Sequence, residues 1–320
     1  MHNCKIGLAL GAGCARGWAH IGVLRALNEA GIHPDIVVGT SIGAVVGGCY
    51  VTGELDAVER FARDLTRRKV LGFLDFNFSG SGLITGQRLC NALEASMKDA
   101  TIESLPKRFV AVATEIGTGH EVWLSRGRIV DAVRASYALP GIFRPVAIEG
   151  RWLFDGALVN PIPVSVCRAL GARYVIAVNV NSDMSSRGTV VPQFEALPPP
   201  PPPPEPEPAR DEGLFARNSR AVKKLLQRQL FGRTDNSPGI SRVMVEAFNV
   251  VQDRISRSRL AGDPPDIIIQ PRMPDCGLFD FHRADEFIQS GVNAVRRDID
   301  DIKREIAARA ATPALLARSA

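Results

Sequence analysis

The stretch that decides the fold reads Ile36-Val37-Val38-Gly39-Thr40-Ser41-Ile42-Gly43-Ala44-Val45-Val46-Gly47. The β-branched apolar residues at its start are typical of a buried strand. Glycines at 39 and 43 flank Ser41, and glycine permits the tight backbone that a sharp turn needs. The apolar residues that follow continue as a buried helix would. The stretch therefore predicts a strand that turns into a helix, with Ser41 at the turn.

A membrane span is the alternative for this region. From Ile36 to Gly53 there is no charged residue over 18 residues, which is the lower limit for a spanning helix. Five of these residues are glycine, a poor helix former in water. A strand, a turn and a buried helix therefore explain the stretch better.

Further strands are predicted on both sides of this unit, at 5–10, 109–113, 174–180 and 266–270, because each is a short apolar run. Helical patterns lie between them, such as the one from Trp18 to Ala30 that stops at Gly31. Strands that alternate with helices indicate an α/β fold with a mostly parallel sheet covered on both faces.

Of the 320 residues, 5–310 are predicted to form a single domain. A proline-rich segment, 184–212, is interpreted as a flexible insertion within it, because the run from Pro198 to Pro208 favours polyproline II and neither helix nor strand. The strand predicted at 266–270 needs a sheet to join, so we prefer an insertion to a domain boundary. Residues 311–320 are predicted to be a disordered tail.

Positive charge is concentrated in one part of the chain. The net charge is +5, and the segment 213–260 holds ten Lys or Arg against three Asp or Glu. A local basic patch favours an acidic partner, here an anionic membrane surface, and the alternative is a solvated helix face. Few aromatic residues interleave with the basic ones, which disfavours nucleic acid.

The six cysteines are scattered and include no C-x-x-C pair. That pattern predicts neither a zinc site nor a disulfide scaffold, so we expect a reducing compartment and no metal. The first residues lack the basic region and long apolar run of a secretory signal. We therefore expect a cytoplasmic protein, peripheral at the inner membrane face if the basic patch binds lipid.

Ser41 is the candidate nucleophile. The pattern Gly39-x-Ser41-x-Gly43 at a strand-to-helix turn is that of a nucleophile elbow, which presents a serine hydroxyl at the end of the sheet. The start of the helix favours the negative charge that develops there. The alternative is a glycine turn with a helix-capping serine.

The loop from Gly11 to Gly17 also joins a strand to a helix, so its backbone N–H groups could hold an anion. Arg16 stands where the third glycine of a dinucleotide fingerprint belongs, and the Gly-Lys-Ser/Thr of a P-loop is missing. An oxyanion hole that serves Ser41 is the remaining interpretation.

Two kinds of base could activate the serine. Ser41, Asp155 and His282 follow the order of an α/β-hydrolase triad, but that fold places more strands before its elbow. His20 lies on an apolar helix face, as a core histidine would. Asp155 follows a strand-like run, and it would need a dry site to raise its proton affinity enough to act alone.

At these residues the chain resembles the patatin-like phospholipases, in the bacterial branch related to neuropathy target esterase. The resemblance covers roughly 5–181 and more weakly 264–302. Four blocks agree in order, and together they are specific: Leu8-Ala9-Leu10-Gly11-Ala12-Gly13-Cys14-Ala15-Arg16-Gly17 with Ala19-His20-Ile21-Gly22-Val23-Leu24; Gly39-Thr40-Ser41-Ile42-Gly43; Ala135-Ser136-Tyr137-Ala138-Leu139-Pro140-Gly141-Ile142-Phe143-Arg144-Pro145; and Asp155-Gly156-Ala157 with Asn160-Pro161.

The resemblance implies a three-layer α/β/α patatin-like fold and a Ser41–Asp155 dyad that needs no cofactor. It also implies an acyl-enzyme intermediate and a phospholipid or lysophospholipid substrate. The implied oxyanion hole comprises Gly11, Ala12, Gly13, Cys14, Arg16 and Gly17, with Arg16 fixing the loop. The chain departs from the family's glycine run at Ala12 and Cys14, and from its Asp-Gly-Gly at Ala157.

Two other functions remain open at this point. An acyltransferase with Ser–His chemistry would depend on His20 or His282. A non-catalytic regulator would keep the fold and bind a partner, for instance through the proline-rich segment. The sequence does not indicate an oligomeric state.

Overall fold

The computed structural model describes residues 4–73, 87–97, 99–181, 240–274 and 276–316. The chain forms two units, one of Met1–Ser186 with Gln252–Ala320 and one of Arg187–Val251. In the second unit the described residues, 240–251, are helical and belong to α10 (Ile240–Gly262). The predicted insertion at 184–212 and the basic residues 213–239 lie outside the described residues.

The first unit is built on a mixed sheet that, among the described residues, has eight strands in the order β5-β6-β3-β2-β1-β7-β8, with β4 also paired to β3. The central strands β3, β2, β1, β7 and β8 run parallel. The pairs β3–β4, β3–β6 and β5–β6 are antiparallel. The strands are β1 (Ile6–Leu10), β2 (Ile36–Thr40), β3 (Arg108–Glu115), β4 (Glu121–Leu124), β5 (Val146–Ile148), β6 (Arg151–Asp155), β7 (Tyr174–Val178) and β8 (Ile267–Ile269).

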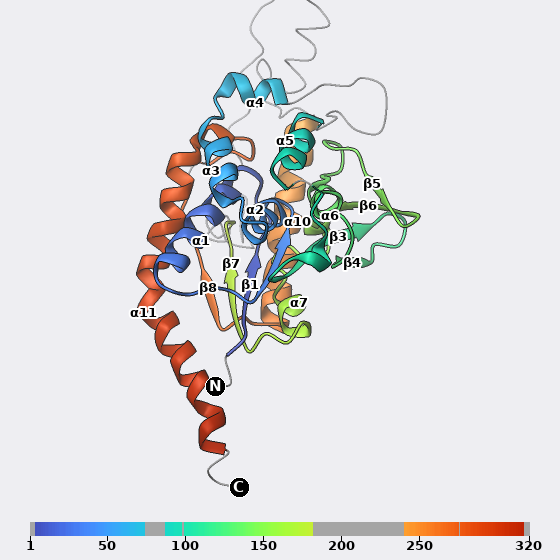
Figure 1. Ribbon diagram of the computed structural model, residues 1–320. Helices are drawn as coiled ribbons and strands as arrows, with labels where there is room; N and C mark the ends of the chain where they lie inside the picture. The colour runs from blue at the N-terminus through green and yellow to red at the C-terminus, as the bar shows by residue number, and fades with distance from the viewer. Residues whose placement is uncertain (1–3, 74–86, 98, 182–239, 275, 317–320) are drawn as a thin grey trace, which may run out of the picture. The chain divides into compact units, whose positions relative to one another are not determined.

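Helices cover both faces of this sheet (Figure 1). Leu8 and Leu10 of β1 belong to a core with α1, α2, α6 and α11, whereas Ala9 belongs to a second core with α7 and Leu260. Successive strand residues point to opposite faces, so a strand buried on both is apolar throughout. The helices are α1 (Ala19–Glu29), α2 (Ile42–Val51), α3 (Leu55–Arg63), α4 (Arg67–Phe73), α5 (Gln87–Met97), α6 (Ile129–Tyr137), α7 (Val164–Ala169), α10 and α11 (Ala284–Leu316). The predicted three-layer α/β/α fold is confirmed.

The long helix α11 packs along α1, far from it in sequence, as Figure 1 shows. Two glycines allow the close approach. A β-carbon on Gly22 of α1 would overlap the backbone of Ile288, and one on Gly291 of α11 would overlap that of Ala19. The two helices therefore bring their backbones nearly into contact, and α11 is part of the core.

The structure differs from the sequence prediction in two places. Strands β4 and β5 were not predicted, since both are short and lie beside exposed loops with few apolar residues to mark them. Helix α11 continues to Leu316, into the stretch 311–320 for which a disordered tail was predicted. Alanine is the best helix former, and the run Ala307-Ala308-Arg309-Ala310-Ala311 favours helix up to the start of that stretch.

The uncharged stretch 36–53 forms β2 and α2, nearly all of it buried inside the first unit. Of the helices described, none combines the length and apolar character that crossing a membrane would require.

Candidate active site

Ser41 lies at a sharp turn between β2 and α2. Its backbone angles are φ 57° and ψ −123°, a conformation that a residue with a side chain rarely adopts. The turn is compact because a β-carbon on Gly39 would overlap Ala44, and one on Gly43 would overlap the Leu10 carbonyl. The serine is thus held at the end of the sheet where an elbow places it.

A side chain from α6 stabilises the strained turn by hydrogen bonding. The Ser41 N–H donates to Ser136 Oγ at 2.9 Å, and that hydroxyl donates in turn to the Val112 carbonyl of β3 at 2.6 Å. Ser136 is fully buried. Sequence reasoning assigned it no role, although it lies in one of the four blocks that carry the resemblance.

Asp155 reaches Ser41 through the register of the sheet. Thr40 is paired with Val112 on β3, and the next residue of β3, Ala113, is paired with Asp155 on β6. β4 pairs with the other edge of β3, so β2 and β6 share one edge, and Ser41 and Asp155 meet where β2 ends and β6 continues the pairing. The Ser41 hydroxyl donates to Asp155 Oδ2 at 2.7 Å.

The carboxyl of Asp155 is almost completely buried, with 1% of its surface exposed. Burial disfavours the charged form and raises the pKa of Asp155 to about 7, although hydrogen bonds from the Ala157 N–H and the Ser41 hydroxyl oppose the shift. The Ala157 N–H donates to Oδ1 at 2.8 Å and so fixes the orientation of the carboxyl. A carboxylate with this pKa is far more basic than a free aspartate.

The N–H groups of the glycine-containing loop after β1 differ in whether they have a hydrogen-bond acceptor. The N–H of Gly11 donates to Val178 and that of Ala12 to Pro161, at 3.1 and 2.9 Å. Within the described residues, the N–H groups of Gly13 and Cys14 meet no acceptor. Gly11 and Ala12 therefore use their donors to anchor the loop, whereas the donors of Gly13 and Cys14 remain available.

The other predicted loop residues support its shape. Arg16 is buried, and its Nε donates to the Gly13 carbonyl at 3.5 Å. Gly17 packs so closely on Ile42 of α2 that a β-carbon would overlap that side chain. Cys14 has a positive φ of 47°, the conformation that glycine adopts without strain.

An apolar pocket opens beside the serine. It contains about 870 Å³ of empty space including its mouth, and Ser41, Asp155 and Cys14 stand along its wall. The rest of its lining is aromatic and aliphatic: Trp18, Ile42, Val45, Phe61, Leu65, Val70, Tyr137, Leu139, Phe143, Phe279 and Phe281. A wall with so few polar groups suits a hydrocarbon chain.

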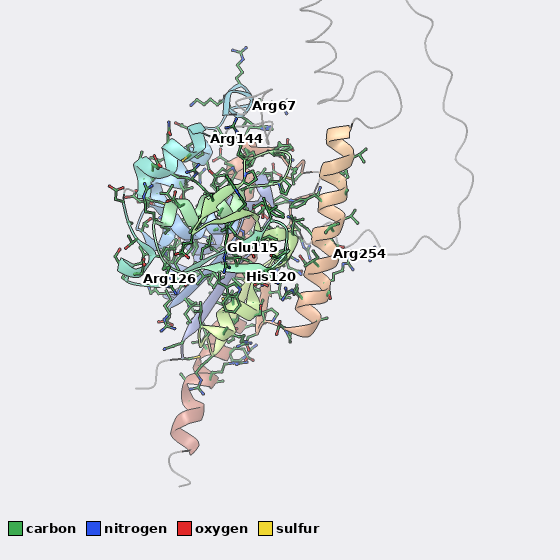
Figure 2. All side chains as sticks on the ribbon, turned by 90° about the vertical axis from the view of Figure 1, so that its right-hand side faces the viewer. Arg67, Glu115, His120, Arg126, Arg144 and Arg254 are labelled. Atoms are coloured by element: carbon green, nitrogen blue, oxygen red, sulfur yellow. The ribbon has the colours of Figure 1, made fainter. Side chains whose placement is uncertain are left out.

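The histidines that could have served as a base are used elsewhere. His20 is fully buried, with Nε2 2.8 Å from the Gly11 carbonyl, and burial lowers the pKa of His20 to about 4. His282 lies in the short turn 281–283, where its Nε2 accepts from Arg67 at 3.1 Å. His120 faces Glu115 at the β3–β4 connection (Figure 2), with 3.7 Å between Nδ1 and Oε2.

A search of the described residues finds no group of three or more His, Cys, Asp or Glu side chains arranged to hold a metal ion. The polar atoms gathered around Ser41 are a carboxylate, a hydroxyl and backbone N–H groups, which are suited to acyl transfer.

Comparison with known proteins agrees with this chemistry. A model of the patatin-like phospholipase family matches residues 8–168. An uncharacterized NTE family protein of Mycobacterium tuberculosis is 31% identical over 326 aligned positions, which cover 90% of this chain and 89% of that protein. A lysophospholipase of Emericella nidulans is 36% identical over 182 residues, 55% of this chain but 12% of that protein.

A patatin-like phospholipase domain-containing protein of Caenorhabditis elegans is 39% identical over 183 residues, 55% of this chain and 14% of that protein. The crystal structure of VipD from Legionella pneumophila covers 94% of this chain and 67% of its own at 13% identity, a distant likeness with a TM-score of 0.43. The family model spans half of the chain and a relative at 31% identity spans nine-tenths of it. The chain therefore belongs to the patatin-like phospholipase family, in the branch of the NTE proteins, and is a hydrolase of lipid esters.

Proposed function

We propose that this protein cleaves the fatty-acyl ester bond of phospholipids or lysophospholipids through a Ser41–Asp155 dyad. The observation that carries the proposal is the 2.7 Å hydrogen bond from the Ser41 hydroxyl to a buried carboxylate whose pKa is raised to about 7. A general base works best when its pKa lies near the working pH. No histidine among the described residues contacts this pair.

The proposed reaction has two halves. Asp155 takes the Ser41 proton while Oγ attacks the ester carbonyl, and the resulting oxyanion accepts hydrogen bonds from the Gly13 and Cys14 N–H groups. Asp155 then gives its proton to the departing alcohol, which leaves an acyl group on Ser41. Asp155 then takes a proton from water as the water oxygen attacks this acyl-enzyme, and returns that proton to Ser41 Oγ as the fatty acid leaves. Because the base must be ionised, kcat/KM rises as the pH rises through about 7.

The pocket supports a substrate with a long acyl chain. Its aromatic and aliphatic wall receives the chain, and the polar head group stays at the mouth, where Phe279 is 37% exposed. The basic segment 213–260 remains our candidate for contact with an anionic membrane. Most of it lies outside the described residues.

The test is covalent labelling with a fluorophosphonate, located by peptide mass, on the wild type, Ser41→Ala and Asp155→Asn. We expect labelling of Ser41 in the wild type and its loss in both variants. Purified lysophosphatidylcholine and phosphatidylcholine then distinguish a monoacyl from a diacyl substrate by the fatty acid released. His282→Gln is the control, because a Ser–His acyltransferase that used His282 would lose its labelling in this variant.

A folded wild type that the reagent does not label would contradict the proposal and favour a non-catalytic regulator. Labelling that persists at full rate in Asp155→Asn would contradict the dyad alone. In that case another base would have to serve Ser41.

A further inference from the structure

Three successive carbonyls of the loop after β1 are held by three different side chains. The Gly11 carbonyl accepts from His20 Nε2 at 2.8 Å, and the Ala12 carbonyl accepts from Asn181 Nδ2 at 2.9 Å. The Gly13 carbonyl accepts from the N–H and Nε of Arg16, at 3.2 and 3.5 Å. In a trans peptide the next N–H points away from the carbonyl, so a donor that fixes a carbonyl also aims the N–H behind it.

Asn181 is the member of this set that the family motifs do not contain. It lies just past the end of β7, with 8% of its surface exposed, and its own N–H donates to Asn179 Oδ1 at 2.9 Å. Its side-chain oxygen, Oδ1, is buried and has no partner among the described residues. A buried amide with one unpaired oxygen is costly, so packing alone would favour an apolar residue here.

The direction of the Gly13 N–H is inferred from the order of the strands. β1 lies between β2, which leads into Ser41, and β7, which leads to Asn181. Asn181 draws the Ala12 carbonyl toward the β7 side, so the Gly13 N–H of the same peptide is turned toward the β2 side. That N–H is one of the two that meet no acceptor in the described part of the chain.

We propose that Asn181 is a positioning residue for ester hydrolysis, because its amide fixes the Ala12–Gly13 peptide and so aims the Gly13 N–H at the oxyanion formed on Ser41. The inference rests on the proposed function. It assigns to the end of β7 a part in transition-state stabilisation, although Asn181 does not touch the substrate. A donor fixed before the reaction does not have to reorganise when charge develops.

The test replaces the amide by an apolar group of similar shape. Loss of a whole oxyanion-hole donor costs about 10² to 10³ in rate, so a donor that is present but poorly aimed should cost roughly ten- to a hundredfold. For Asn181→Leu we expect kcat on a p-nitrophenyl ester to fall by this factor while KM stays unchanged, because the acyl pocket is intact. The matched control is Gln252→Leu, since Gln252 Oε1 accepts from Asn181 Nδ2 at 3.5 Å and, among the described residues, no hydrogen bond joins Gln252 to the loop.

A second measurement distinguishes a misdirected Gly13 N–H from a general loss of structure. A trifluoromethyl ketone adds to Ser41 and forms a hemiketal oxyanion, so its inhibition constant reports the oxyanion hole directly. We expect this constant to rise in Asn181→Leu by the same factor as kcat falls, and to be unchanged in Gln252→Leu. If Asn181→Leu does not fold, Asn181→Ala gives the same comparison with no group in place of the amide.

Three outcomes would overturn the inference while leaving the proposed function in place. They are an unchanged inhibition constant beside a lower kcat, a rise in KM alone, and equal losses in the Asn181 and Gln252 variants. A wild type that the fluorophosphonate does not label at Ser41 would overturn both proposals.

Discussion

Asp155 shows how one buried carboxyl serves reactivity at the expense of stability. The pocket beside it is mostly apolar, and among the described residues only the Ala157 N–H and the Ser41 hydroxyl donate to it. The same burial that raises the pKa of Asp155 to about 7 makes the ionised form costly in the folded protein. Burial therefore makes Asp155 a stronger base and at the same time lowers the stability of the folded protein.

We expect Asp155→Asn to be more stable than the wild type at pH 8. The folded pKa of about 7 lies above the unfolded value near 3.8, so this group favours folding below about pH 4 and loses that contribution as the pH rises through 7. At about 1.4 kcal/mol per pKa unit, the amide should raise the free energy of unfolding by roughly 1–4 kcal/mol at pH 8.

Urea unfolding at pH 5 and pH 8 checks this prediction, and the gain should be smaller at pH 5. Asp99→Asn is the control, because the Asp99 side chain is 99% exposed. A gain that is equal at both pH values would show that ionisation of Asp155 is not its cause.

At the scale of elements, the parallel core of the sheet and the strand-like run of β6 could be predicted, whereas the short antiparallel strands β4 and β5 could not. Strands β1, β2, β3, β7 and β8 are short apolar runs, as burial between two helical layers requires. β5 has three residues, none of them fully buried, and β4 begins with an acidic residue, so neither carries a strong apolar signal.

The site divides in the same way. Ser41 and Asp155 have local motifs that a reader of the sequence can find. Ser136 and Asn181 hydrogen-bond to backbone atoms of Ser41 and Ala12, which lie 95 and 169 residues away, and a polar side chain carries no sign of such a distant partner. The loop from Gly11 to Gly17 stays a predicted oxyanion hole, and which of its N–H groups are occupied depends on β7 and on Pro161, which the sequence of the loop does not reveal.

The packing of α2 on β1 gives a test at this scale. A β-carbon at residue 43 would overlap the Leu10 carbonyl, so Gly43→Ala must push the start of α2 away from the sheet. We expect a loss of about 1–3 kcal/mol in the free energy of unfolding, as for other overpacked sites, together with loss of fluorophosphonate labelling.

Gly262→Ala is the matched control, since nothing lies within 4 Å of a β-carbon there. Chemical unfolding and labelling measured on both variants check the prediction. Retention of full labelling by Gly43→Ala would contradict it, because Ser41 lies at the start of the helix that is displaced.

At the scale of the whole molecule, α11 near the C-terminus packs into the same core as α1 near the N-terminus. Phe287, Ile288, Val295 and Ile302 of α11 are all buried, although hundreds of residues separate them from α1. Each buried side chain of this size is worth about 1.5–3 kcal/mol, whereas a domain is stable by only about 5–15 kcal/mol in total.

A chain cut after Arg283 should therefore not fold cooperatively. A chain cut after Ala310 should melt close to the full-length protein, because it retains Ile302, the last fully buried side chain of α11 among those whose burial is described. Thermal melting followed by circular dichroism compares the two. A cooperative transition in the shorter chain would show that α11 is dispensable.

The three hydrogen-bonded carbonyls of the loop after β1 also affect how the reaction rate depends on temperature. A loop bound at Gly11, Ala12 and Gly13 by His20, Asn181 and Arg16 has little freedom left to lose. The activation entropy of acylation should then be close to that of positioning the ester alone, and the barrier should be mainly enthalpic. Substrates would accordingly be distinguished by how well their acyl chains fit the preformed pocket wall. A preferred substrate would not gain rate by ordering the catalytic loop, because the loop is already ordered.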